Sequence, residues 1–241
     1  DVALSYIFGH SYAVCDVPST SSSSNWNRTY ALDLNHPVLS FSSYDVPHKL
    51  SVSAAYHKRY ARLFDVTAGV VYQLSSGQRY SLTFGESVDF NGDGVYGSTL
   101  MYIPTEEELS RMRFADDESQ QKWNDFIESD NYLRKHRGEF SERNAMQAPA
   151  EGRVDVHLAH GFYFGRETSR KVELTLDIMN FGNMLCRHWG SYYNVGNVRL
   201  QPVNIVSEQD GEAVYRFTNS ALTPNDLMSR WRMQLGVRVK F

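Results

Sequence analysis

The last twelve residues of the sequence read Arg230-Trp-Arg-Met-Gln-Leu-Gly-Val-Arg-Val-Lys-Phe241. Successive side chains of a β-strand point to opposite faces, so this alternation predicts a strand with one apolar and one strongly polar face. A soluble β-sandwich strand gives the same alternation. A span of about 10 residues that is apolar outside, polar inside and ends on an aromatic is typical of an outer-membrane β-barrel. The apolar row is Trp231, Met233, Leu235, Val237, Val239 and Phe241.

Length, net charge and composition restrict the classes of protein to which this chain can belong. A chain of 241 residues forms one large β domain or two small ones. The net charge of −4 is small and of the wrong sign for a nucleic-acid partner. No apolar run approaches the ~18 residues of a transmembrane helix, but alternating barrel strands do not need one. With 15 Tyr, 13 Phe and 4 Trp, the chain has the aromatics for two interfacial girdles.

Five further segments alternate in the same way, and the gaps between the strands are informative. The segments cover residues 3–12, 50–57, 66–74, 154–163 and 171–178. In chain order the gaps are long, short, long, short and long. Outer-membrane barrels have short periplasmic turns and long extracellular loops, which explains this sorting; a soluble Greek-key sandwich does not. Six strands are too few to enclose a barrel interior, so we expect a piece of a larger cylinder.

The gaps differ in character. The first contains the low-complexity tract Pro18–Ser24 and is expected to be an irregular loop. The second long gap, 86–150, is expected to be a folded extracellular loop. Thr105 and Glu108 fit a capping box. Asp116 or Asp117 begins a second predicted helix, and Gly138 ends the stretch after that helix. The last gap, 183–228, is expected to contain a hairpin near Gln201 and Val214–Thr218.

Several short motifs, in order along nearly the whole chain, resemble the C-terminal part of TonB-dependent outer-membrane receptors. The branch is the one with a carboxypeptidase-regulatory-like N-terminal domain. Each motif is weak alone, and together they are specific. They are Tyr6–Ser11, Tyr44–His48, Asp89–Gly94, Tyr102–Pro104, Phe126–Asp130, His136–Gly138, Glu142–Asn144, Asp177–Asn183 and Trp231–Phe241.

The resemblance implies a 22-stranded barrel in the outer membrane of a Gram-negative bacterium, importing a scarce nutrient such as a glycan, a peptide or a metal chelate. Residues 1–241 would form the C-terminal part of one barrel domain. The plug, the segment that contacts TonB and about sixteen strands would lie outside this sequence, which also starts without a signal peptide. The implied partners are outer-membrane lipid, the TonB complex, the barrel-assembly machinery and a surface lipoprotein lid, with no nucleic acid.

One loop has the pattern of a cation site. Asp89, Asn91, Asp93 and Gly94 match the first half of a calcium loop, D-x-N-x-D-G. The twelfth position is Leu100, where a bidentate Glu is expected. An Asp/Asn/Gly turn explains the same residues. We favour the turn, keep Ca²⁺ as the alternative, and expect no other cofactor.

The polar parity of the strands predicts which charges line the barrel lumen. We expect charge pairing in a hydrated interior, with a contact to substrate or plug as the alternative. On a strand, His157 and His160 fall on opposite faces and do not share a metal. Cys15 and Cys186 would sit about 19 Å apart, so a disulfide is not expected. The lumen residues are Arg230, Arg232, Arg238, Lys240, Asp155, Glu173 and Asp177.

The last strand has a second predicted role. Trp231, Val239 and Phe241 fit a C-terminal signal read by the barrel-insertion machinery, which adds strands by edge pairing. An ordinary closing strand is the alternative. No nucleophile and base pair stands out, so we expect a transporter part without catalysis. The rival hypotheses are a surface β-sandwich that binds glycans, a barrel without a transport role, and a barrel hydrolase.

Overall fold

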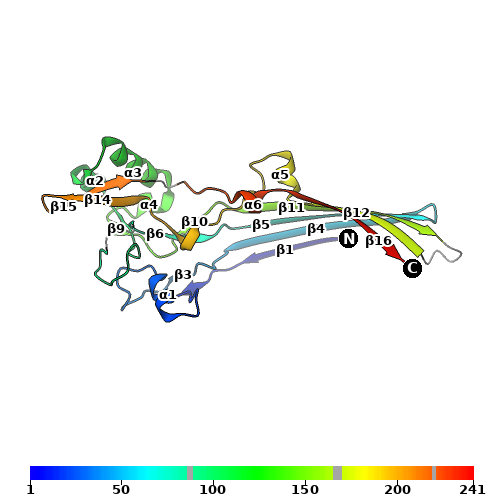
Figure 1. The fold of residues 1–241 in the computed structure, drawn as a ribbon, viewed down its shortest axis with the longest axis horizontal. Helices are drawn as coiled ribbons and strands as arrows, with labels where there is room; N and C mark the ends of the chain where they lie inside the picture. Colours follow the sequence, from blue (N-terminus) through cyan, green and yellow to red (C-terminus); the bar gives the residue numbers. More distant parts are fainter. Residues whose placement is uncertain (86–88, 165–169, 219–220) are drawn as a thin grey trace.

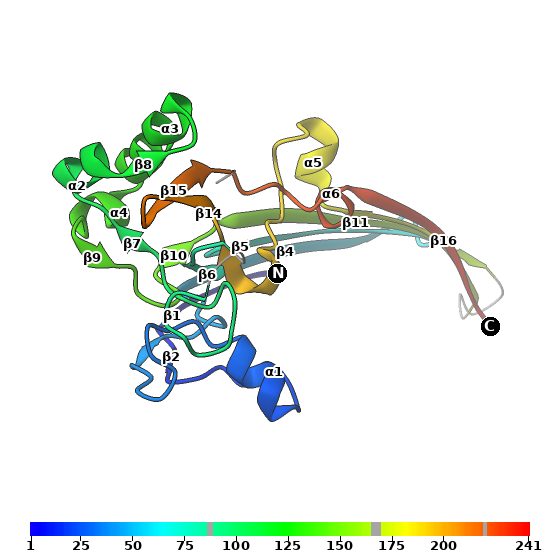
Figure 2. The ribbon, with the colours of Figure 1, turned by 60° about the vertical axis from the view of Figure 1, so that its left-hand side comes forward.

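The structure, a computed structural model, describes residues 1–85, 89–164, 170–218 and 221–241. It has two parts. One is a long sheet, and the other is a body built from the connecting segments, which we call the loop body (Figure 1). Figure 2 shows that the sheet is strongly curved and that the loop body gathers at one end of it.

The long sheet contains six antiparallel strands that pair in chain order. This confirms the six predicted strands and their up-and-down succession, although the first strand ends at Phe8 rather than at residue 12. Three residues join the second strand to the third, whereas the long connections run through the loop body. The predicted turn at Gly165–Arg170 falls on residues outside the description, apart from Arg170 itself. The strands are β1 (Val2–Phe8), β4 (His48–Tyr60), β5 (Phe64–Ser75), β11 (Glu151–Phe164), β12 (Arg170–Met179) and β16 (Arg232–Lys240).

The strand register lines up the apolar residues of all six strands on one face. Leu235 of β16 lies opposite Leu176 of β12, and Leu176 lies opposite Leu158 of β11. Leu158 in turn lies opposite Ala68 of β5, which lies opposite Tyr56 of β4. Within the described part of the chain, no second layer covers this row, and Leu235 remains 78% exposed. We call these residues, together with their neighbours of the same parity, the apolar face.

The sheet is open. Its edges are β1 and β16, which do not pair with each other in the described structure. The expectation of all-β, antiparallel strands holds for this sheet, and a closed barrel is not seen. Six strands are too few to close around a packed interior, which accounts for the open edges.

The tightly packed core lies in the loop body rather than in the sheet. Side chains from three helices and from short strands converge there, and Trp123, Ile127 and Leu133 are completely buried. The loop 86–150, outside residues 86–88, is therefore folded, as predicted. The core consists of Tyr80, Leu82, Phe84, Met101, Ile103, Leu109, Trp123, Ile127, Leu133, Met146, Ala148, Val195 and Val203.

The second long connection supplies these three helices, whose starts are set by their capping residues. The Thr105 hydroxyl accepts from the Glu108 backbone N–H, and the Glu108 carboxylate accepts from the Thr105 N–H, as predicted for a capping box. Asp116 caps the next helix through the Ser119 N–H. Gly138, with φ of +85°, follows the third. The helices are α2 (Glu106–Arg111), α3 (Asp117–Ser129) and α4 (Asn131–Lys135).

The other connections are less regular. The Ser-rich tract in the first one was expected to be an irregular loop, but it enters the short helix α1 (Ser22–Asn27). The N-cap residue Ser21 makes no side-chain capping bond, so serine capping does not account for this helix. The predicted hairpin of the last connection is confirmed as β14 (Val203–Gln209) and β15 (Glu212–Phe217). The helices α5 (Phe181–Leu185) and α6 (Asp226–Ser229) flank this connection.

Short strands complete the loop body. They form small sheets, and two of their pairs, β6 with β13 and β8 with β15, are parallel. None of the described helices is long and apolar enough to cross a membrane. The remaining elements are β2 (Tyr12–Ala13), β3 (Ser40–Phe41), β6 (Arg79–Leu82), β7 (Tyr102–Ile103), β8 (Arg113–Phe114), β9 (Glu139–Phe140), β10 (Met146–Gln147), η1 (Gly196–Val198) and β13 (Arg199–Leu200).

Candidate functional site

An ion network joins three neighbouring strands on the polar face of the sheet. The Lys171 ammonium of β12 lies 2.8 Å from the Asp65 carboxylate of β5 and also pairs with Glu173. The Tyr163 hydroxyl of β11 donates to Asp65 at 2.8 Å. Asp65 is only 2% exposed, so its charge requires these partners.

Except for Arg230, the predicted lumen residues lie on this face, and most of them are paired with or hydrogen-bonded to neighbours. Arg238 reaches Glu173 at 3.5 Å across the β12–β16 pair. Asp177 accepts from His157 at 2.6 Å. Asp155 pairs with Arg153 at 2.7 Å. Charge pairing therefore holds most of these side chains in place.

Three basic residues in or just before the last strand differ in the contacts that they make. Arg230 was predicted on the polar face, but it follows α6 and pairs with Asp226, because the chain turns into the strand only at Arg232. This corrects the prediction for Arg230. Arg232 donates to the Leu227 carbonyl at 3.3 Å. Lys240 is exposed at the far end of β16, opposite Lys171.

The sequence did not single out Asp65, Lys171 and Tyr163. Their parity places each of them on the polar face, which was visible in the alternation. The register between β5, β11 and β12, which sets them side by side, was not. The glycine at 161 was a further signal, since a Cβ there would lie 2.1 Å from the Asp65 Oδ1.

The predicted cation loop is a hydrogen-bonded turn. The Asp89 carboxylate accepts from the backbone N–H groups of Gly92 and Gly94, each at 2.9 Å. Asp93 accepts from the Val95 N–H at 2.7 Å and from the Asn91 amide at 2.8 Å. The described residues contain no group of three His, Cys, Asp or Glu placed to hold a metal ion. Backbone N–H groups and the Asn91 amide thus use the Asp89 and Asp93 oxygens that calcium would need, which favours the turn, whereas the buried Asn91 Oδ1 has no partner among the described residues.

The histidines and cysteines stand apart from one another. His157 lies on the polar face beside Asp177, whereas His160 accepts or donates a hydrogen bond with the Tyr60 hydroxyl at 2.6 Å on the apolar face. This confirms their predicted opposite sides. Cys15 and Cys186 are both free thiols.

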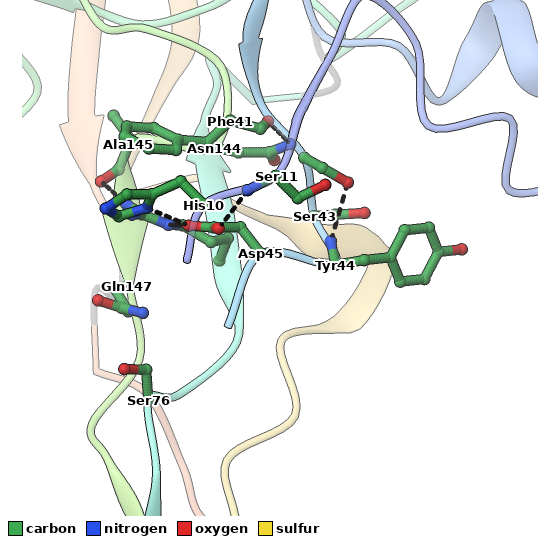
Figure 3. A network of polar contacts seen from close by, with 12 residues as sticks. His10, Ser11, Phe41, Ser43, Tyr44, Asp45, Ser76, Asn144, Ala145 and Gln147 are labelled. Carbon is green, nitrogen blue, oxygen red and sulfur yellow. Dashed lines mark hydrogen bonds and ion pairs between the residues drawn. The ribbon is translucent and has the colours of Figure 1, made fainter. Parts of the chain in front are cut away.

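A buried ion pair ties the first long connection to the second, and Figure 3 shows its acid, Asp45, among its neighbours His10 and Ser11. Asp45 is 1% exposed and accepts from the Arg79 guanidinium at 3.0 Å and from the Ser11 N–H at 2.7 Å. Although burial favours the neutral acid, these hydrogen bonds and one from His10 outweigh it and hold the pKa of Asp45 below its ordinary value. The Arg79 guanidinium also stacks 3.8 Å from the centre of the Phe41 ring.

A second acid, Asp16, is half-buried nearby. Asp16 accepts from the Ser42 hydroxyl at 2.6 Å, from the Ser43 N–H at 2.9 Å and from the Asn144 amide at 3.3 Å. Burial raises the pKa of Asp16, but hydrogen bonds from Ser42 and Ser43 and the neighbouring Arg143 charge lower it by more, so the net direction is down. The two carboxylates tie the first connection to the second.

The predicted insertion signal lies on an exposed strand edge. Val239 and Phe241 are 45% and 90% exposed, and Trp231 stands immediately before β16 at 43%. β16 pairs with β12 on one side, and no described strand pairs with its other side. Both a closing strand and an edge read by another protein need such a free edge.

Comparison with family models, with curated proteins and with solved structures finds no match for this chain.

Proposed function

We propose that this chain is a six-stranded part of an outer-membrane β-barrel whose apolar face contacts lipid. The observation behind the proposal is the inverted distribution of apolar residues. The loop body encloses a buried apolar core, whereas the sheet leaves large apolar side chains exposed on each of its six strands. Soluble monomers rarely expose a contiguous apolar area of this extent, and hydrocarbon is a solvent that favours it.

The size of the apolar face suits a bilayer. From Leu50 to Tyr60, β4 advances ten residues, or about 33 Å at ~3.3 Å per residue. Tilted by about 40–45°, this length spans roughly 25 Å, the height of the apolar band of outer-membrane barrels.

Aromatic rings gather at both ends of the apolar face. At the turn end, Phe64 packs against Tyr60 and Phe162, with ring centres 5.6 and 5.4 Å apart. At the loop end, Phe8 packs against His48 at 5.1 Å. Rings at both interfaces are typical of membrane barrels, because one side of each ring contacts lipid while the other remains near water.

The transport role rests on the family resemblance together with the loop architecture. In this proposal the polar face lines the lumen, and a TonB-coupled plug outside this sequence moves a scarce nutrient past it. The partners are the TonB complex, the barrel-assembly machinery and outer-membrane lipid. The chain itself performs no catalysis. A long, folded loop body at one end, with a three-residue link between β4 and β5 at the other, supports an extracellular and a periplasmic side.

Protease accessibility on whole cells tests the proposal against a soluble or surface-anchored sandwich. We expect cleavage only around residues 19–40, 86–150 and 184–225, because these segments would face the medium. The turn at residues 61–63 should be protected until the outer membrane is permeabilised. Cleavage of that turn on intact cells, or recovery of the protein in the soluble fraction without detergent, would contradict the proposal.

A further inference from the structure

Two hollows meet at Tyr30 on the surface of the loop body. One, of about 90 Å³, lies between the first and second connections, and the other, of about 410 Å³, opens beside it. They share Arg28, Tyr30 and Asn197, so the two hollows adjoin. We call the pair the Tyr30 groove.

The charge in the Tyr30 groove is positive. Arg28 lines both hollows, Arg199 lines the larger and Arg143 lines the smaller. Among the described lining residues the only acid is Asp16, and its oxygens accept hydrogen bonds from Ser42, Ser43 and Asn144. Asp93, beside the groove next to Gly94, is likewise bonded to Val95 and Asn91. The larger hollow contains no carboxylate among its described lining residues.

Arg143 has a buried donor that lacks an acceptor among the described residues. It is only 5% exposed, and its two terminal nitrogens donate to the carbonyl oxygens of Ala13 and Val14. Its Nε is buried without a partner among the described residues. Burial lowers the pKa of its guanidinium, although Asp16 opposes this effect. A buried donor without an acceptor is rare in folded proteins, and an oxygen from a ligand in the smaller hollow would serve it.

Arg28 is the accessible cation. Its side chain is exposed, and within the described residues it has neither a hydrogen-bond nor an ion-pair partner. Arg199 is fixed by a bond from its Nη1 to the Gly97 carbonyl at 2.8 Å, and its Cζ lies 5.7 Å from the centre of the Tyr30 ring. Because Arg199 already has partners, Arg28 is the guanidinium that can turn toward a planar or tetrahedral oxyanion in the shared hollow, and the charge of Arg199 adds to the attraction.

The rest of the lining suits a sugar ring. Tyr96 is 60% exposed and offers an aromatic face, on which the apolar face of a pyranose packs. The amides of Asn27 and Asn197 each supply a donor and an acceptor, which matches hydroxyl groups. We infer that the Tyr30 groove binds an acidic sugar, with the carboxylate or sulfate held by Arg28, the positive charges of Arg199 and Arg143 nearby, and the ring against Tyr96. This inference rests on the proposed function only for the position of the Tyr30 groove on the outside of the cell.

Three sugars that share one ring test the inference. We would titrate the full-length protein in detergent with D-galacturonate, D-galactose 6-sulfate and neutral D-galactose, and follow saturation-transfer NMR signals. At least one acidic sugar should bind about ten-fold more tightly than galactose, since an ion-paired hydrogen bond is worth about one such factor. Which acid binds more tightly identifies the oxyanion as a carboxylate or a sulfate.

A matched pair of exposed arginines locates the site. Arg28→Gln should weaken binding of the acidic sugar about five-fold, while leaving the fold intact because the Arg28 side chain supports no described contact. Arg111→Gln, on the exposed side of α2, is the control and should bind as the parent does. The inference fails if galactose binds as tightly as both acids, if neither acid binds, or if Arg28→Gln behaves like Arg111→Gln. Membrane insertion is measured separately, so such a failure leaves the barrel proposal standing.

Discussion

Individual side chains on the polar face are packed around a buried charge pair. Asp65 and Lys171 meet over Gly161, where a Cβ would lie 2.1 Å from the Asp65 Oδ1 and 2.2 Å from the Lys171 Cε. Glycine is therefore needed at this position for space, since it lies within the extended strand β11. Gly69, on the same face of β5, has no such crowding, because its nearest neighbour would be 3.7 Å away.

This difference gives a prediction with an internal control. Gly161→Ala should destabilise the protein by about 2 kcal/mol, because the added methyl separates Asp65 from Lys171 in an overpacked site. Gly69→Ala should leave stability unchanged or slightly raised, since alanine costs less chain entropy than glycine. The urea midpoint in detergent micelles measures both. Equal midpoints for the two variants would show that the ion network does not depend on Gly161.

The Asp45–Arg79 pair predicts how the loop body responds to acid. The pKa of Asp45 is lower in the folded state, so its carboxylate stabilises the fold above its unfolded pKa of about 3.9, and this stabilisation is lost as the pH falls through the folded value. Asp45→Asn leaves Arg79 buried without its counter-charge and should cost about 3 kcal/mol at neutral pH.

Urea unfolding followed by tryptophan fluorescence, at neutral pH and below pH ~4, tests the role of Asp45. The variant should be less stable at neutral pH and should lose less stability on acidification than the parent. Asp33→Asn is the control, because Asp33 and its partner His36 are both exposed and support no packed contact. If Asp45→Asn matches Asp33→Asn at both pH values, Asp45 does not hold the loop body together.

Among the elements, β16 separates the two faces most clearly. Leu235 lies on the apolar face and is 78% exposed, whereas its neighbour Gln234 lies on the polar face opposite Asp177. Leu235→Arg should reduce the free energy of folding into phospholipid vesicles by about 2–4 kcal/mol, the cost of arginine near the middle of the bilayer. Gln234→Arg should change it little, because that position faces the polar side. A reversed or equal effect would mean that the faces of β16 are assigned wrongly.

The individual elements also show which features of the structure can be predicted from the sequence. Period-two alternation over Val66–Leu74 or Val154–Phe162 is a local signal, and the six strands were predicted from it. Capping by Thr105 and Asp116 was equally local. Register is not local, so the meeting of Asp65, Lys171 and Tyr163 from three strands was missed. The groove around Tyr30 combines all three long connections, and no pattern within one segment predicts it.

At the scale of the whole molecule, the loop body has a buried apolar core, whereas the sheet exposes apolar side chains on one face. Trp123 and Ile127 are completely buried in the loop body, as in a water-soluble domain. Leu4 of the sheet is 71% exposed and Leu174 is 58% exposed. One chain with both distributions is explained if lipid surrounds one part and water the other. Buried pairs such as Asp65–Lys171 then line the inner side, where partners replace water.

The most direct test places a fluorescent reporter on each side of β16. Single cysteines replace Leu235 or Gln234 in a background where Cys15 and Cys186 are serine, each carries an NBD group, and the protein is inserted into vesicles. NBD at position 235 should be quenched by lipid-attached nitroxides and protected from aqueous iodide, with the opposite pattern at 234. Equal quenching of both positions by iodide would show that water, rather than hydrocarbon, covers the apolar face.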